Sequence, residues 1–262
     1  MKGFESRPAR RRGEMHLSDE HVAVEEPLEI RVDGETITVT MRTPGHDVEL
    51  ATGFLFAERV IEQRDDLRAV AHIDTDPDGY HNVIEARLAM GLIDAVKRAH
   101  EASRSLYATS SCGICGTASL ERLRVVCAPI VHTKSVPDEV LFSLPDTLRA
   151  HQPVFAATGG LHGAALFRTN GELVVCREDI GRHNAVDKVI GWAVSNEEEL
   201  LERCVLMVSS RAGFEIVHKA RIARIPTIAA LGAASSLAVD LANDGNQTLI
   251  GWLRDGQCTR YT

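Results

Sequence analysis

The alternation of strand-like and helix-like segments in residues 137–262 constrains the fold more than any other feature of this sequence. A helix is predicted over about 137–150, and a hairpin that turns at Asn170-Gly171 follows it. Three helical segments then alternate with apolar strands, and the chain ends in a hairpin or a pair of edge strands. This alternation is typical of an α/β sheet covered on both faces, in which ligands bind beyond the strand ends.

The first hundred residues have a different order of predicted strands and helices. Apolar and polar residues alternate on both sides of Asp33-Gly34, which predicts a hairpin. A helix that Asp47 can cap is expected next, followed by two further strands around the turn-rich segment 74–81. This order of elements predicts a small α+β unit.

We therefore expect a disordered basic tail over residues 1–15, an N-terminal α+β domain over 16–136 and an α/β domain over 137–262. No apolar run reaches the roughly 18 residues of a membrane helix, so no membrane span is predicted. The formal net charge of −8 argues against a general nucleic-acid binder. The basic cluster Arg10–Arg12 lacks the apolar run of an export signal, so we expect a cytoplasmic protein.

One pair of cysteines has a spacing that carries chemistry. Cys112 and Cys115 lie in TSSCGICGTASLERL, where flanking glycines leave both thiols uncovered and a following helix start favours thiolates. A zinc site would have to recruit distant histidines, because no second CxxC or spaced histidine pair lies nearby. A thioredoxin-type redox pair normally follows a strand, whereas a polar segment precedes this pair. An acceptor for a mobile sulfur atom is the third possibility. Three other cysteines lie in apolar runs and are expected to pack in the core: Cys127, Cys176 and Cys204.

Three loops are candidates for binding an anion. The segment CREDIGRHNAVDKVIG gathers polar groups around Gly181, namely Asp179, Arg182, His183, Asn184, Asp187 and Lys188. TGGLHGAALF places His162 in a glycine-rich loop, and SSRAGFEIVHKA places Ser209, Ser210 and Arg211 between a strand and a helix. Such junctions bind anions through backbone N–H groups, hydroxyls and guanidinium groups. The alternative is that the polar groups cap a helix and face water. Together the loops predict one cleft for an anionic ligand.

Five segments, in this order, closely resemble the FdhD family: SCGICG, TGGLHGAALF, REDIGRHNAVDKVIG, SSRAGFEIVHKA and LIGWLRDGQCTRYT. The resemblance runs from EEPLEIRVDG to the end of the sequence. It implies a cytidine-deaminase-like fold for 137–262, a three-layer α/β/α arrangement with a mixed sheet. It also implies a homodimer and a role as a sulfur carrier for maturing formate dehydrogenase.

The resemblance also implies partners and site residues. Cys112 would receive persulfide sulfur from a cysteine desulfurase, with Cys115 as the second thiol. The sulfur would pass to the molybdenum cofactor that carries two pterin-guanine dinucleotides (the bis-molybdopterin guanine dinucleotide cofactor), and no tightly bound zinc is expected. Cofactor contacts are implied at Trp252, Leu253, Arg254, Asp255, Gly256 and Gln257, where Gln257 replaces an expected Arg. The anion-binding loops add Arg182, His183, Ser210, Arg211 and His162 as cofactor-binding candidates.

Three function classes follow. The first is a sulfurtransferase-type persulfide carrier, the second a redox oxidoreductase using a Cys112–Cys115 disulfide, and the third a non-catalytic chaperone for the molybdenum cofactor. Zinc deaminases share the implied fold and are a rival. Their motif is absent, because the nearest match is CRE at 176–178 and no P-C-x-x-C follows it.

Overall fold

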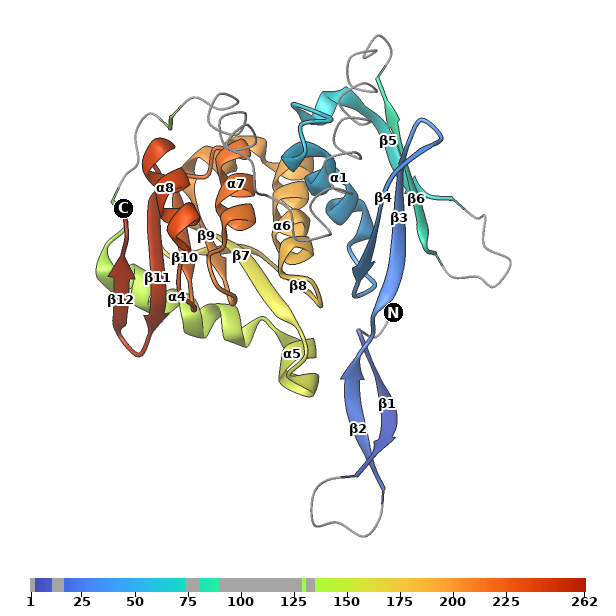
Figure 1. Ribbon diagram of the computed structural model, residues 1–262, viewed down its shortest axis with the longest axis horizontal. Helices are drawn as coiled ribbons and strands as arrows, with labels where there is room; N and C mark the ends of the chain where they lie inside the picture. Colours follow the sequence, from blue (N-terminus) through green and yellow to red (C-terminus); the bar gives the residue numbers. More distant parts are fainter. Residues whose placement is uncertain (1–2, 11–16, 74–80, 90–128, 131–134) are drawn as a thin grey trace.

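The structure is a computed structural model that describes residues 3–10, 17–73, 81–89, 129–130 and 135–262 (Figure 1). The elements before residue 90 are β1 (Phe4–Ala9), β2 (Ser18–Ala23), β3 (Glu26–Val32), β4 (Glu35–Arg42), α1 (Asp47–Ala57), the 3-10 helix η1 (Arg64–Asp66), β5 (Leu67–His72) and β6 (Val83–Leu88). The elements after residue 135 are α4 (Asp138–Ala150), α5 (Pro153–Thr158), β7 (His162–Arg168), β8 (Leu173–Asp179), α6 (Arg182–Asn196), the 3-10 helix η2 (Glu198–Arg203), β9 (Cys204–Val208), α7 (Phe214–Ile222), β10 (Thr227–Ala230), α8 (Ser236–Asp244), β11 (Thr248–Arg254) and β12 (Gln257–Arg260).

The N-terminal sheet has four strands in the order β4-β3-β6-β5. The hairpin predicted at Asp33-Gly34 is confirmed: it joins β3 to β4, and both turn residues have positive φ, 48° and 89°. A two-residue turn of this handedness matches the twist of the strands on each side, which is why Asp-Gly favours it. The helix predicted from Asp47 is α1, but Asp47 does not cap it. Its carboxylate pairs with the buried Arg42 at 3.2 Å instead.

The larger sheet has six strands in the order β12-β11-β10-β9-β7-β8. β9, β10 and β11 are parallel, whereas the β7–β8, β7–β9 and β11–β12 pairs are antiparallel, so the sheet is mixed. α6, α7 and α8 pack on one face and α4 on the other. The predicted three-layer arrangement with a mixed sheet is confirmed.

The two sheets share one hydrophobic core, which runs from Leu28 in β3 to Leu249 in β11. Helices α1 and α6 lie between the sheets and touch through their backbones (Figure 1). A Cβ atom on Gly53 would lie 1.9 Å from the carbonyl oxygen of Asp187, and one on Gly191 would lie 1.9 Å from that of Glu49. Only glycine permits this approach.

The N-terminal segment differs from its prediction. Within the expected disordered tail, Phe4–Ala9 form β1, which pairs antiparallel with β2 in a hairpin that extends away from the sheets (Figure 1). A disordered tail was predicted because the segment is basic, and composition does not reveal contacts with a partner strand. One such contact is between the rings of Phe4 and His21, whose centroids lie 4.7 Å apart. The short helix α5 was not predicted either.

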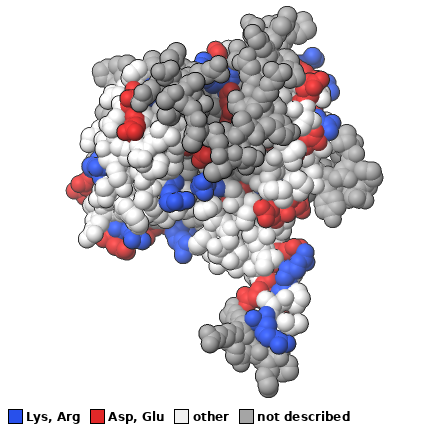
Figure 2. Space-filling view, in the orientation of Figure 1, with Lys and Arg blue, Asp and Glu red and all other residues white. Residues whose placement is uncertain are grey.

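On the face seen in Figure 2, acidic and basic side chains of the described residues are interspersed. Within the described ranges, no helix is both long enough and apolar enough to cross a membrane.

We predict that Gly53→Ala lowers the free energy of unfolding by about 3 kcal/mol or more, because the added methyl group forces α1 away from α6. The measurement is chemical denaturation followed by circular dichroism. Gly213→Ala is the control: its Cβ meets nothing within 4 Å, and a change below about 1 kcal/mol is expected at that helix start. Equal effects of the two substitutions would contradict the close contact.

Candidate functional site

Residues from all three candidate anion-binding loops meet in one hollow of about 470 Å³ at one edge of the six-stranded sheet. Its lining is polar and basic, and we call it the arginine hollow: His162, Arg182, Ser209, Ser210, Arg211, Leu231, Gly232, Trp252 and Arg254. Ser209 and Leu231 directly follow the carboxyl ends of the parallel strands β9 and β10. The topology therefore brings together loops that are far apart in the sequence, as predicted for such a sheet.

The arginine hollow is rich in positively charged groups. None of its three guanidinium groups, on Arg182, Arg211 and Arg254, forms an ion pair with another described residue. Ser209 and Ser210 also line the hollow: the Ser209 hydroxyl accepts a hydrogen bond from the Gly163 backbone, and the Ser210 hydroxyl donates one to the carbonyl oxygen of Arg211. Guanidinium and hydroxyl donors with no carboxylate partner favour an anion with several oxygen atoms, such as a phosphate or pyrophosphate.

Trp252 has an unusual backbone for a bulky residue in a strand. Its φ is +53°, at a bulge in the β11–β12 pairing between Gly251 and Arg254. A tryptophan in the left-handed region is strained, and such strain is concentrated at functional sites. The conformation leaves the ring 43% exposed at the arginine hollow, with the Arg254 guanidinium 5.0 Å from the ring centroid.

The other predicted contacts of the C-terminal segment do not line this hollow. Leu253 is fully buried in the core between the sheet and α4. Asp255 and Gly256, with φ of 53° and 68°, form the tight turn between β11 and β12, and the exposed Gln257 begins β12. Neighbouring side chains along a strand point to opposite faces. Leu253 faces inward, so Trp252 before it and Arg254 after it face the other way.

The two predicted histidines have different surroundings. His162 lines the hollow, and its pKa is lowered by burial and then by the nearby charges of Arg182 and His183. His183 does not line it. Its Nε2 lies 3.0 Å from a carboxylate oxygen of Glu215 in α7, and this contact lowers the pKa of Glu215.

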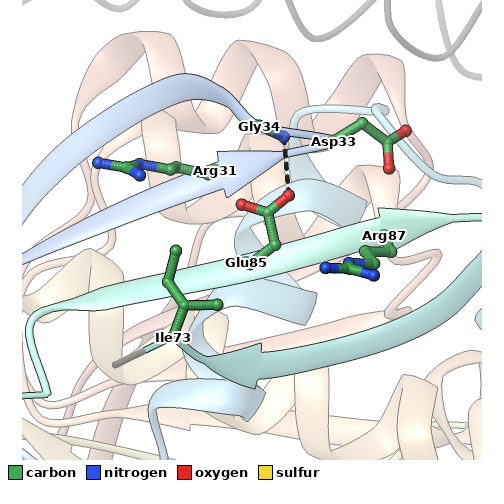
Figure 3. Close-up of a pocket in the computed structure, with 6 residues that line it drawn as sticks. All are labelled: Arg31, Asp33, Gly34, Ile73, Glu85 and Arg87. Atoms are coloured by element: carbon green, nitrogen blue, oxygen red, sulfur yellow. Dashed lines mark hydrogen bonds between the residues drawn. The ribbon is translucent and has the colours of Figure 1, made fainter. Parts of the chain in front are cut away.

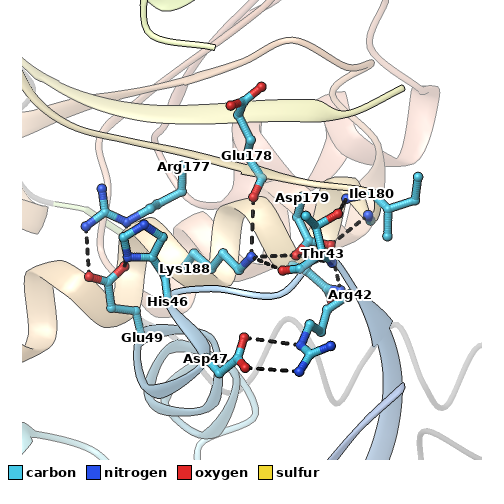
Figure 4. A network of polar contacts seen from close by, with 12 residues as sticks. Arg42, Thr43, His46, Asp47, Glu49, Arg177, Glu178, Asp179, Ile180 and Lys188 are labelled. Atoms are coloured by element: carbon cyan, nitrogen blue, oxygen red, sulfur yellow. Dashed lines mark hydrogen bonds and ion pairs between the residues drawn. The ribbon is translucent and has the colours of Figure 1, made fainter. Parts of the chain in front are cut away.

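The polar residues of REDIGRHNAVDK divide into two groups. Arg182 faces the hollow, whereas Asp179 and Lys188 form a fully buried ion pair of 2.7 Å (Figure 4). Asp179 also accepts hydrogen bonds from the Thr43 and Gly181 backbones and from Asn184, and Lys188 donates to the carbonyl oxygens of Thr43 and Glu178.

Asp187 pairs with Lys219 of α7 at 2.8 Å, also in the interior. Asp179, Asn184, Asp187 and Lys188 are therefore buried and do not line the arginine hollow. They fasten the end of β4 and the helix α7 to α6, a role that burial reveals and sequence spacing does not.

A second hollow, of about 510 Å³, lies on the N-terminal sheet (Figure 3). Its charged groups are largely satisfied: Glu85 accepts a hydrogen bond from the Gly34 backbone at 2.7 Å, and Arg31 makes a two-point pair with Glu29. A site whose charges already pair with each other has less to offer a ligand than the arginine hollow.

The predicted sulfur site is the pair Cys112 and Cys115. Both of these cysteines, and Cys127, lie outside the described residues. Burial raises the pKa of Cys176 and Cys204 to about 12, so both remain protonated thiols at neutral pH. Cys204 packs in the core as predicted, and Cys176 is half-buried. Within the described ranges, no three His, Cys, Asp or Glu side chains are arranged to hold a metal ion.

We predict that Lys188→Met destabilises the protein by about 3–5 kcal/mol, because it leaves the buried Asp179 carboxylate without its cation. Chemical denaturation measures this, and the double variant Asp179→Asn/Lys188→Met should recover part of the loss. Arg224→Met, which removes an exposed 2.6 Å pair with Glu202, is the control and should cost less than about 1 kcal/mol. A loss at Lys188 as small as that of the control would show that the pair is not structural.

We predict that His162 titrates below the ordinary histidine pKa of about 6.5 and is neutral at pH 7. Adding pyrophosphate should raise this pKa, since the anion offsets the charge of Arg182, and Arg182→Met should raise it without any anion. Nuclear magnetic resonance titration of the imidazole proton, assigned with His162→Gln, measures both shifts. A midpoint that does not move in either case would rule out an anion beside His162.

Comparisons with known proteins agree with these features. The sequence matches the FdhD/NarQ family over residues 23–262. It is 47% identical over 255 residues to the "Sulfur carrier protein FdhD" of Mycolicibacterium paratuberculosis, which covers 95% of this chain and 93% of that protein. It is 48% identical to the protein of that name from Mycobacterium tuberculosis, over 93% of this chain and 90% of the relative.

A solved structure, titled a putative formate dehydrogenase accessory protein from Desulfotalea psychrophila, has the same fold. Its TM-score is 0.74 at 23% sequence identity, with 99% of this chain and 96% of that chain covered. The family match spans both sheets and every segment that lines the arginine hollow. The chain belongs to the FdhD/NarQ family.

Proposed function

We propose that this protein is a sulfur carrier that serves the maturation of formate dehydrogenase. It accepts sulfur at Cys112 from a cysteine desulfurase and delivers it to the bis-molybdopterin guanine dinucleotide cofactor, which is the substrate. The observation that carries the proposal is the arginine hollow, with three unpaired guanidinium groups among its described lining residues, in a chain that belongs to this family. Relatives 46–48% identical to it are named sulfur carrier proteins.

The lining of the hollow suits the cofactor. Each dinucleotide has a pyrophosphate, whose oxygens match the donors of Arg182, Arg211 and the two serines. The exposed ring of Trp252 offers a flat apolar surface to one of the cofactor's ring systems. The proposal includes the homodimer and the cytoplasmic location that the family resemblance implies.

Neither of the two sulfur-transfer steps needs an external oxidant. The Cys112 thiolate attacks the outer sulfur of the desulfurase persulfide, so that one S–S bond forms, another breaks and the desulfurase cysteine leaves as a thiolate. Release of the outer sulfur as sulfide needs two electrons. Attack of the Cys115 thiolate on the inner sulfur supplies them, since it forms a Cys112–Cys115 disulfide and expels HS⁻ toward molybdenum. An external thiol then reduces the disulfide.

The sulfur step is tested by incubating the full chain with a cysteine desulfurase and cysteine, followed by peptide mass spectrometry. We expect one added sulfur atom on the Cys112 peptide, none in Cys112→Ala, and wild-type loading in the control Cys258→Ala. In Cys115→Ala, which cannot expel the sulfur by forming the Cys112–Cys115 disulfide, the absence of added sulfur on the Cys112 peptide would indicate a redox oxidoreductase instead. Cells in which Cys112→Ala still supports formate dehydrogenase activity would indicate a chaperone that only holds the cofactor.

The binding step is tested with guanosine diphosphate and isothermal titration calorimetry. Arg182→Met and Arg211→Met should each weaken binding about tenfold or more, because each removes a charge-assisted hydrogen bond to phosphate. Arg87→Met removes the same charge from the hollow on the N-terminal sheet and should leave affinity unchanged. An equal effect of all three would mean that only general charge matters and would refute the assignment of the arginine hollow.

A further inference from the structure

The backbone of Trp252 is fixed by a contact with the loop that follows β10. The backbone N–H of Trp252 donates to the carbonyl oxygen of Gly232 at 3.0 Å. The N–H of Gly232 donates in turn to the carbonyl oxygen of Ser210 at 3.2 Å. Two hydrogen bonds in series therefore connect Trp252 to the loop that carries Arg211. They fix the position of the indole relative to the phosphate-binding side of the arginine hollow.

Gly251 lies against the same carbonyl group. A Cβ atom on Gly251 would lie 2.8 Å from the oxygen of Gly232 and 3.0 Å from the ring carbon Cε2 of Tyr261. Both distances are shorter than van der Waals contact allows. The oxygen that accepts the Trp252 N–H is therefore an atom that a methyl group at position 251 would displace. Because the φ of Gly251 is not positive, glycine is needed here for the close approach and not for the backbone angle.

This hydrogen bond holds the bulge at which Trp252 takes its left-handed conformation. The pairing of β11 with β12 shifts register between Gly251 and Arg254, and the φ of Trp252 is +53°. A bulky residue stays in this region only when the surrounding structure holds it there. A bulge redirects the side chain that it carries, and here the indole lines the arginine hollow. Without the hydrogen bond, Trp252 would return to ordinary strand angles and its ring would point elsewhere.

We infer that Gly251 is a positioning residue for the ligand of the arginine hollow. Because position 251 carries no side chain, the Gly232 carbonyl holds Trp252 in the conformation that presents its ring to a ring system of the ligand. The inference rests on the proposed function, from which it takes a ligand with both a pyrophosphate and a ring system. It adds a residue that does not line the hollow and acts through Trp252.

The first test compares inorganic pyrophosphate with guanosine diphosphate, which carries a ring system, by isothermal titration calorimetry on the full chain. Gly251→Ala should lose about fivefold or more in affinity for guanosine diphosphate, because the redirected indole no longer stacks on a ring. It should bind pyrophosphate within about twofold of the wild type. Gly213→Ala, whose Cβ meets nothing within 4 Å, is the control and should bind both ligands as the wild type does.

A double-mutant cycle shows whether Gly251 acts through the indole. Trp252→Ala removes the ring, so adding Gly251→Ala to it should change the affinity for guanosine diphosphate by less than about twofold. A further loss of about fivefold would overturn the inference, since Gly251 would then act on another part of the site. Two results for Gly251→Ala alone would overturn it as well: an unchanged affinity for guanosine diphosphate, or an equal loss of pyrophosphate binding.

Backbone amide exchange separates positioning of the indole from a general loss of the fold. The chain has two tryptophans, Trp192 in α6 and Trp252, so ¹⁵N-tryptophan labelling gives two backbone signals in nuclear magnetic resonance spectra. In the wild type the Trp252 amide should exchange at least about a hundredfold more slowly than an unstructured amide, because Gly232 accepts its hydrogen bond. Gly251→Ala should abolish this protection and leave Trp192 protected.

Each other result of the exchange measurement contradicts the inference. A wild-type Trp252 amide that exchanges like an unstructured one would show that the hydrogen bond does not hold the residue. Loss of protection at both tryptophans in Gly251→Ala would show that Gly251 maintains the fold rather than the indole. Protection of Trp252 that survives the substitution would show that the Gly232 carbonyl is not displaced.

The affinities of the wild type distinguish failure of the inference from failure of the proposed function. If the wild-type chain binds neither pyrophosphate nor guanosine diphosphate, the proposed function fails and the inference fails with it. If it binds both and Trp252→Ala keeps the full affinity for guanosine diphosphate, the proposed function stands and the inference alone fails.

Discussion

The backbone contact between α1 and α6 holds the rest of the structure in place. Gly53 and Gly191 let the two helices approach until a methyl group on either would overlap the other helix's carbonyl oxygen. At this distance the N-terminal sheet and the six-stranded sheet bury their apolar faces in one core. The buried Asp179–Lys188 pair joins β8 to α6, and the buried Asp187–Lys219 pair joins α6 to α7, so α6 is fixed on both sides. Arg182 is the first residue of α6, so its position in the site follows from the packing of this helix.

Much of the fold could be predicted from local pattern. Asp33-Gly34 and Asn170-Gly171 marked two hairpins because their backbone preferences are local, and the alternation of helical and strand-like segments after residue 137 predicted a sheet covered on both faces. β1 could not be predicted, because Phe4–Ala9 are held by a partner strand rather than by their own composition. Asp47 resembled a helix cap in the sequence. In the structure its carboxylate instead forms an ion pair with the buried Arg42, a contact that exists only after the strand and helix have packed.

The candidate site was predictable to the extent that topology placed it. Arg182, Arg211 and His162 were expected together because the ends of neighbouring strands meet at one edge of such a sheet, and they do. Asp179 and Lys188 look equally ligand-like in the sequence, and only their burial assigns them to the interior.

The left-handed backbone at Trp252 bears on the entropy cost of binding a ligand at the exposed indole. A non-glycine residue in that conformation stores roughly 1–3 kcal/mol, which the surrounding sheet must hold even before any molecule arrives. The indole is therefore preorganised, and association loses little conformational entropy in ordering it. A ligand that stacks on this ring meets a surface that is already in place, so more of the contact energy contributes to affinity.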